Sequence, residues 1–365
     1  MKSRVGNIEC LRFLFAVCIV LHHAMIDRFP MWGGFLSVEF FYILSGAFMG
    51  KSIRKKEESA NTYSMREACI ESSQYCWRRI KGIMPYFFVS TIIGTFILGV
   101  TYDWRFNLEN ILNILNDFLF LQSYGFPVMS VTGVVWYLSS MFFAMWILYP
   151  IARNKYYLYT YYIAPILAFV FMGQLIKLYG TLNVPAEYLF GVVCTGNMRA
   201  IGMISLGFVV NEVSNKLASK KNSKYVNTLL TIIEIILYLY IFWYMHIWNE
   251  SISRFDEVEV FAMAIALSIT LSGKSVLQSV FDNKFSIFLG KYSVSLFLSH
   301  FYWVQNIQNI LYKLGYSESL RPKLLGIIMS FVTALGVMIC GDFLKNIVGK
   351  YKEWYEIKYQ MNKCL

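Results

Sequence analysis

The chain has little charge for its length. Asp, Glu, Lys and Arg make up only 15% of its 365 residues, whereas hydrophobic residues make up 57% and the mean hydropathy is +0.49. A soluble globular domain carries about 25% charged residues. The shortage of charge excludes an ordinary soluble protein, and we expect no appended soluble domain.

The cysteines lack the spacing that binds a metal or builds a disulfide framework. Seven are scattered along the chain, and none belongs to a CxxC pair. We therefore expect ordinary reduced thiols and no metal site. The net charge of +11 does not indicate a nucleic-acid partner either, because Lys and Arg lie between hydrophobic runs, as topology determinants do.

Apolar runs long enough to cross the ~30 Å hydrocarbon core of a membrane recur along the chain. Hydrocarbon offers no hydrogen-bond partners, so such runs must form helices. We predict an all-α, polytopic transmembrane helix bundle of about ten spans. The spans lie near residues 8–26, 34–50, 84–100, 134–151, 159–178, 199–213, 226–246, 257–273, 286–309 and 324–344. The second and sixth are short and polar, and should pack inside the bundle rather than face lipid.

Positive charge predicts the orientation of the bundle. With the N-terminus inside, the inner segments carry 23 Lys and Arg residues and the outer loops carry five. Cytoplasmic loops are the ones enriched in positive charge, so both termini are predicted to be cytoplasmic. We divide the chain into a membrane-embedded domain over 1–345 and a basic cytoplasmic tail over 346–365.

Two long connections separate the early spans. Residues 51–83 are basic and are predicted to be cytoplasmic, and residues 101–133 contain the pattern LENILNILNDFLFLQ. Its alternating apolar and polar residues are typical of an amphipathic helix at the membrane interface.

Two polar residues interrupt the first span. Arg12 and His23 are eleven residues apart, which at 100° per residue places them on one helix face, about 16 Å apart along the axis. We expect Arg12 near the cytoplasmic end and His23 in the outer half. Ionisable residues at bilayer depth are costly and usually functional or tightly paired. The alternatives are a snorkelling Arg12 and a structural, hydrogen-bonded His23.

Glu39 and His300 are predicted to lie at the same depth as His23 in two other spans. Either side chain could orient the imidazole of His23, the role that the acidic member plays in catalytic triads. Glu39 could instead reach the outer interface. Ser45 and Gly46, in EFFYILSG, allow close helix packing.

A basic cluster of Arg78, Arg79 and Lys81 precedes Pro85, where the third span begins on the cytoplasmic side. Positive-inside anchoring explains such a cluster without a ligand. An anion site is the sharper interpretation, because guanidinium groups bind phosphate well.

These residues fall in segments that resemble the acyltransferase-3 family of integral membrane acyltransferases, which modify sugars and lipids of the bacterial envelope. Five segments occur in the family's order: ECLRFLFAVCIVLHH, SVEFFYILSG, RRIKGIMPYF, WYLSSMFFAMWILYP and LGKYSVSLFLSH. The resemblance spans residues 4 to about 303, and the region between 155 and 195 contributes little to it.

The resemblance implies roles for individual residues. The family's arginine and histidine in the first helix match Arg12 and His23, and its acidic residue before paired phenylalanines matches Glu39. Its arginine-rich patch matches Arg78 and Arg79. The expected supporting residues are Ser45, His300, Trp136 and Arg199, the last of which matches a further arginine of the family.

Two positions depart from the family pattern. A later arginine of the basic patch is replaced by Gly82, with Lys81 beside it, and Met141 stands where many relatives carry a glutamate. These departures leave open how the patch is completed and whether a second carboxylate takes part.

The resemblance implies transfer of an acyl group, often acetyl, from acyl-CoA to a hydroxyl of an envelope glycan or lipid-linked sugar. Acyl-CoA would be a substrate that binds near Arg12, Arg78, Arg79 and Lys81, and no cofactor would be held permanently. The expected location is the bacterial cytoplasmic membrane, with membrane lipid as a further partner. Direct transfer, a covalent acyl-histidine intermediate and a homo-oligomer all remain open.

A transporter or flippase for an envelope precursor is the main rival interpretation. Arg12, His23 and Glu39 would then form a path for a proton or a substrate, since such proteins also need ionisable groups within the membrane. The chain lacks the paired broken helices, in matching halves, that many transporters show. A glycan polymerase that uses no CoA is a third interpretation.

Overall fold

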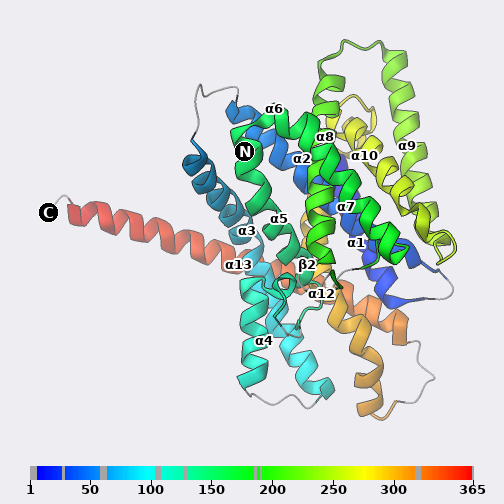
Figure 1. Cartoon of the computed structure of the whole chain (residues 1–365). Helices are drawn as coiled ribbons and strands as arrows, with labels where there is room; N and C mark the ends of the chain where they lie inside the picture. The colour runs from blue at the N-terminus through cyan, green and yellow to red at the C-terminus, as the bar shows by residue number, and fades with distance from the viewer. Residues whose placement is uncertain are drawn as a thin grey trace.

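A computed structural model shows the chain as an all-α bundle (Figure 1). It describes residues 6–26, 29–57, 64–102, 108–126, 130–184, 187–189, 191, 193–316 and 322–363, with side chains as far as Tyr351. The predicted tail therefore falls largely outside the described side chains, although the backbone of its helix is described as far as Lys363.

The helices follow one another with short connections. The α-helices are α1 (Gly6–Ala24), α2 (Ser37–Glu57), α3 (Met65–Tyr102), α4 (Leu108–Leu119), α5 (Val135–Asn154), α6 (Tyr156–Leu158), α7 (Ala164–Tyr179), α8 (Thr195–Ser219), α9 (Lys224–Ile247), α10 (Asp256–Ser272), α11 (Leu277–Phe281), α12 (Lys284–Lys313) and α13 (Pro322–Lys363). Short 3₁₀ segments are η1 (Trp32–Leu36), η2 (Gln122–Tyr124) and η4 (Ser253–Phe255), and a π-helical turn, η3 (Tyr159–Ile163), joins α6 to α7. Two-residue strands β1 (Tyr188–Leu189) and β2 (Val193–Cys194) pair antiparallel.

Each of the predicted spans falls on a helix. Within the described ranges, seven helical segments are long and apolar enough to cross a membrane. The three remaining predicted spans lie on α8, α10 and α12. Helix α10 has only 17 residues, and α8 and α12 carry polar side chains that are buried inside the protein. The span count and the orientation stay predictions.

Helices α2 and α8 form the centre of the bundle, as their polar sequences predicted. An 18-residue apolar stretch of Trp32–Glu57, the segment that comprises η1 and α2, is 83% buried, and most residues of α8 are buried. Gly46 and Gly207 let the two backbones touch. A Cβ on Gly46 would lie 2.0 Å from the carbonyl oxygen of Ile204, and one on Gly207 would lie 2.2 Å from that of Ile43. Small residues at a crossing permit this close approach within membranes.

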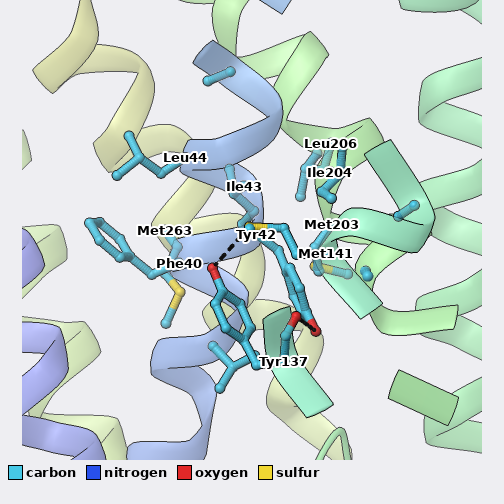
Figure 2. Close-up of a cluster of buried hydrophobic side chains, with 14 of the residues drawn as sticks. Phe40, Tyr42, Ile43, Leu44, Tyr137, Met141, Met203, Ile204, Leu206 and Met263 are labelled. Atoms are coloured by element: carbon cyan, nitrogen blue, oxygen red, sulfur yellow. Dashed lines mark hydrogen bonds between the residues drawn. The ribbon is translucent and has the colours of Figure 1, made fainter. Parts of the chain in front are cut away.

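The packed core lies where α2, α5, α8 and α10 meet (Figure 2). Tyr42 of α2 lies against Tyr137 of α5, with ring centroids 4.7 Å apart. The hydroxyl of Tyr137 donates a hydrogen bond to the sulfur of Met141, one turn further along α5 (Figure 2). Aromatic and methionine side chains thus fill the space between these helices.

The two long connections are more helical than the sequence suggested. Helix α2 continues to Glu57 and α3 begins at Met65, so most of the predicted cytoplasmic connection 51–83 extends these two helices. The second connection contains α4, whose polar residues Asn110, Asn113 and Asp117 are buried while its leucines are exposed. The amphipathic helix is therefore confirmed, and its interfacial position stays a prediction.

Helix α13 crosses the predicted boundary between domain and tail without a break. It runs for 42 residues, and its C-terminal end lies far from the other helices (Figure 1). The boundary at residue 345 therefore marks a change of composition within one helix.

The glycine crossing gives the first testable prediction. Gly46→Ala places a methyl group in the space of the Ile204 carbonyl and should destabilise the fold by about 1–3 kcal/mol, since overpacking forces the backbones apart. Thermal unfolding of purified protein in detergent would measure the loss. Gly173→Ala on α7 is the matched control, because open space surrounds that glycine. Equal unfolding temperatures for the two variants would contradict the crossing.

The positive-inside orientation gives the second testable prediction. A fluorescent protein fused after Leu365 should fluoresce, because folding of that reporter requires the cytoplasm, and alkaline phosphatase at the same point should be inactive. Alkaline phosphatase fused after Tyr316, in a predicted outer connection, should be active. The reversed pattern would show that the bundle is inserted the other way.

Candidate functional site

Two histidines from helices far apart in sequence meet in the bundle. His23 near the C-terminal end of α1 places Nδ1 2.9 Å from Nε2 of His300 on α12, and their rings lie 5.1 Å apart. His300 is fully buried. Phe301 packs edge-on against the ring of His23 at 5.1 Å. The histidine pair therefore sits in an apolar, aromatic setting.

The hydrogen bonds of this pair assign its tautomers. His300 Nδ1 lies 2.8 Å from the carbonyl oxygen of Phe297 and 3.2 Å from that of Leu296. A carbonyl only accepts, so Nδ1 of His300 carries the hydrogen and its Nε2, when neutral, accepts. His23 must then donate from Nδ1. Its Nε2 keeps a lone pair, which is the form required of a general base.

Helix α1 also packs tightly against α12 near its own N-terminal end, on the face that carries Arg12. A Cβ on Gly290 of α12 would lie 1.7 Å from Oε2 of Glu9, so glycine alone leaves room for that carboxylate. Glu9 in turn accepts a hydrogen bond of 2.8 Å from Nη1 of Arg12, one turn away. The Arg12 guanidinium is thus paired, but it is still partly exposed.

Arg12 lines a cavity of about 220 Å³ between α1, α2, α3, α5 and α12. Arg79 of α3 lines the same cavity and is held by the hydroxyl of Tyr75, which accepts its hydrogen bond at 2.6 Å. Most of the remaining lining is apolar. The cavity therefore offers two guanidinium groups in a mostly hydrophobic space.

The basic cluster predicted from the sequence divides in the structure. Arg79 faces the cavity, whereas Arg78 and Lys81 are exposed on the outside of α3, with Lys81 over the ring of Trp77 at 5.1 Å. Nothing lies within 4 Å of a Cβ built on Gly82, so this position leaves open space rather than a replacement cation.

Ser45 and Met141 contact each other in the wall of the cavity. The Ser45 hydroxyl donates to the Met141 sulfur at 3.6 Å, and the Tyr137 hydroxyl donates to the same sulfur at 3.6 Å. A thioether is a weak acceptor without charge. Met141 therefore makes this wall of the cavity neutral.

Glu39 pairs with Arg199 rather than with His23. The guanidinium donates from Nε and Nη2 to the two carboxylate oxygens at 2.8 and 2.7 Å, and the side chains are 0% and 1% exposed. Trp136 covers the guanidinium with its ring, 5.4 Å from Cζ. Helix α2 turns this carboxylate toward α8, its closest neighbour, whereas His23 faces α12. Of the two candidate partners of His23, the structure brings His300 to it, and Glu39 does not reach the outer interface.

Some of these contacts were open to sequence reasoning. Glu9 was missed as the partner of Arg12, although a spacing of three residues on a helix is typical of such pairs. The aromatic rings of Phe41 and Phe297, which line the cavity, were missed as well. Phe297 lies one helical turn before His300, and that spacing could have indicated that its ring lies next to the histidine.

Other polar or hollow features lie away from this site. His246, in the last turn of α9, is exposed, and its Nδ1 lies 2.7 Å from the carbonyl oxygen of Pro30. A larger, almost wholly apolar cavity of about 300 Å³ lies between α7, α8 and α10. None of the predicted site residues lines it.

Comparison with known proteins identifies one relationship. The model of the acyltransferase-3 family, described as an acyltransferase domain, matches residues 5–342. This range contains the histidine pair, the cavity and the Glu39–Arg199 pair. No curated protein and no solved structure matches the chain.

The buried ion pair gives a prediction about stability. Glu39→Ala leaves the guanidinium of Arg199 without its partner and should cost about 3–5 kcal/mol, because an unpaired charge is stranded in the protein interior. The double variant Glu39→Ala/Arg199→Ala should be more stable than Glu39→Ala alone. Chemical unfolding in detergent measures both, with exposed Glu109→Ala as the control. Additive losses in the double variant would contradict the coupling.

Proposed function

The chain belongs to the acyltransferase-3 family, and we propose that it moves an acyl group, acetyl in the simplest case, from acyl-CoA to a hydroxyl of an envelope glycan or lipid-linked sugar. Acyltransferase activity in a membrane protein follows from the family. The donor, the acceptor and the bacterial cytoplasmic membrane as the location are our proposal.

The cavity supports acyl-CoA as the donor. Phosphate groups need cations, and Arg12 and Arg79 present two guanidinium groups at the predicted cytoplasmic end of the cavity. Exchange of Glu9 for a phosphate would keep Arg12 paired when the donor binds. Arg78 and Lys81 lie outside the cavity, so we assign them attraction of the anionic donor from the cytoplasm.

The histidine pair supports the chemical step. The acceptor oxygen attacks the thioester carbonyl carbon, the C–S bond breaks, and an ester and the thiol of CoA form. His23 Nε2 takes the proton from the hydroxyl and returns it to the departing thiolate. His300 holds the His23 ring in this tautomer through the carbonyl of Phe297. The neutral imidazole of His300 thus takes the orienting role that a carboxylate has in a catalytic triad.

The carbonyl–His300–His23 hydrogen-bond chain is the observation on which the proposal depends. It directs a lone pair of His23 away from His300, on the helix face that carries Arg12 about 16 Å nearer the cytoplasm. One helix face thereby joins an anion-binding end to a proton-accepting end. Glu39, with Arg199 and Trp136, would support α2 and α8 beside this face.

Substitution of His23 tests the proposal. His23→Ala should lower the rate of acyl transfer from labelled acetyl-CoA to membranes of the source cells by about 10²–10⁴-fold, the usual contribution of a general base. His300→Ala should give a smaller loss, because His23 keeps its basicity but loses its orientation. His246→Ala on the protein surface is the matched control. Near-normal transfer by His23→Ala would refute the mechanism, and an inactive wild type that moves a glycan precursor would favour a flippase.

A further inference from the structure

The wall of the donor cavity contains three aromatic rings. Helices α2, α5 and α12 each contribute one: Phe41, Tyr137 and Phe297. The ring of Tyr137 lies 5.4 Å from that of Phe297, and Phe41 lies 6.3 Å from each of the other two. The three rings therefore contact one another in pairs and form a continuous aromatic cluster in the cavity wall.

The histidine pair lies next to this cluster. Phe297 precedes His300 by one helical turn, and their rings lie 6.0 Å apart. His23 and His300 do not line the cavity, whereas Arg12, Arg79 and Phe297 do. Phe297 therefore both lines the space that would hold the donor and contacts the ring of His300, the partner of the proposed base.

We propose that the rings of Phe41, Tyr137 and Phe297 determine which nucleophile receives the acyl group, by keeping water from the thioester until the acceptor displaces Phe297. This inference rests on the proposed function and deepens it. Sites that handle reactive groups exclude water to prevent hydrolysis. Here the risk is specific, because His23 would activate a water molecule as readily as a sugar hydroxyl.

The competing reaction is hydrolysis. Water would attack the thioester carbonyl carbon, the C–S bond would break, and a carboxylic acid and the thiol of CoA would form. His23 would take a proton from the water and return it to the thiolate, as in the transfer reaction. The same base therefore serves both reactions, and access to the thioester decides between them.

Phe297 can be substituted without changing the hydrogen bonds of the histidine pair. The contact that fixes the tautomer of His300 is made by the main-chain carbonyl of Phe297, not by its side chain. Phe297→Ala therefore removes the ring and keeps the histidine chain. The side chain is only partly buried because it faces the cavity, so its loss enlarges an existing space.

The test measures thiol release from acetyl-CoA by purified full-length protein in lipid nanodiscs, without acceptor. The wild type should hydrolyse acetyl-CoA slowly, and Phe297→Ala should do so about tenfold faster or more. The double variant His23→Ala/Phe297→Ala should lose that gain. Phe285→Ala, an exposed phenylalanine on the same helix, should match the wild type. Should Phe297→Ala fail to fold, Phe41→Leu provides the same test from α2.

The outcomes separate the two proposals. Fast hydrolysis by the wild type without acceptor, or an unchanged rate in a folded Phe297→Ala, overturns the role of the rings while transfer to membranes by the wild type still supports the proposed function. A wild type that consumes no acetyl-CoA with membranes present, and variants that hydrolyse none, overturn both.

Discussion

The need to pair Arg199 and Arg12 inside the bundle is the constraint on which the rest of this structure depends. A lone charge in hydrocarbon is costly, so each of these arginines fixes the position of a carboxylate. Arg199 and Glu39 are both inaccessible to solvent and make a two-pronged ion pair. That pair requires α2 and α8 to lie close together, and Gly46 and Gly207 make the approach sterically feasible. The ion pair and the glycine crossing therefore specify the same packing of α2 against α8.

The same constraint shapes the candidate site. Arg12 is held by Glu9, and the room for Glu9 exists because α12 has Gly290 at the point of contact. Since α12 is fixed there against α1, its next three turns run beside the C-terminal half of α1. His300 therefore arrives beside His23. A glycine near one end of α1 thus contributes to the alignment of a histidine pair near its other end.

Much of the fold could be predicted from the sequence, because the cost of polar backbone in hydrocarbon leaves helices as the only solution for long apolar runs. The shared face of Arg12 and His23 followed from helical geometry alone. What the sequence could not supply was the rotation of one helix against another. Glu39 and His300 were both expected at the depth of His23, and only packing decides that Glu39 faces α8 while His300 faces α1.

Local contacts that do not depend on residue type were the other limit on prediction from the sequence. The partner that fixes His300 is a main-chain carbonyl, and every residue has one, so no residue type could mark it. The split of the basic cluster has a similar cause. Arg78 and Arg79 are neighbours in sequence, but successive residues on a helix point about 100° apart, so one faces the cavity and the other does not.

The resemblance to the family implied a glutamate at the position of Met141, and this arrangement gives the methionine a physical meaning. A carboxylate at that point would need a partner within the membrane, and its charge would oppose an anionic donor. The thioether instead accepts weak hydrogen bonds from Ser45 and Tyr137 and leaves the wall neutral. Tyr137 is also one of the three rings that line the cavity. The hydrogen bond from its hydroxyl to Met141 therefore anchors that ring, whereas the rings of Phe41 and Phe297 make no such bond and can move without breaking one.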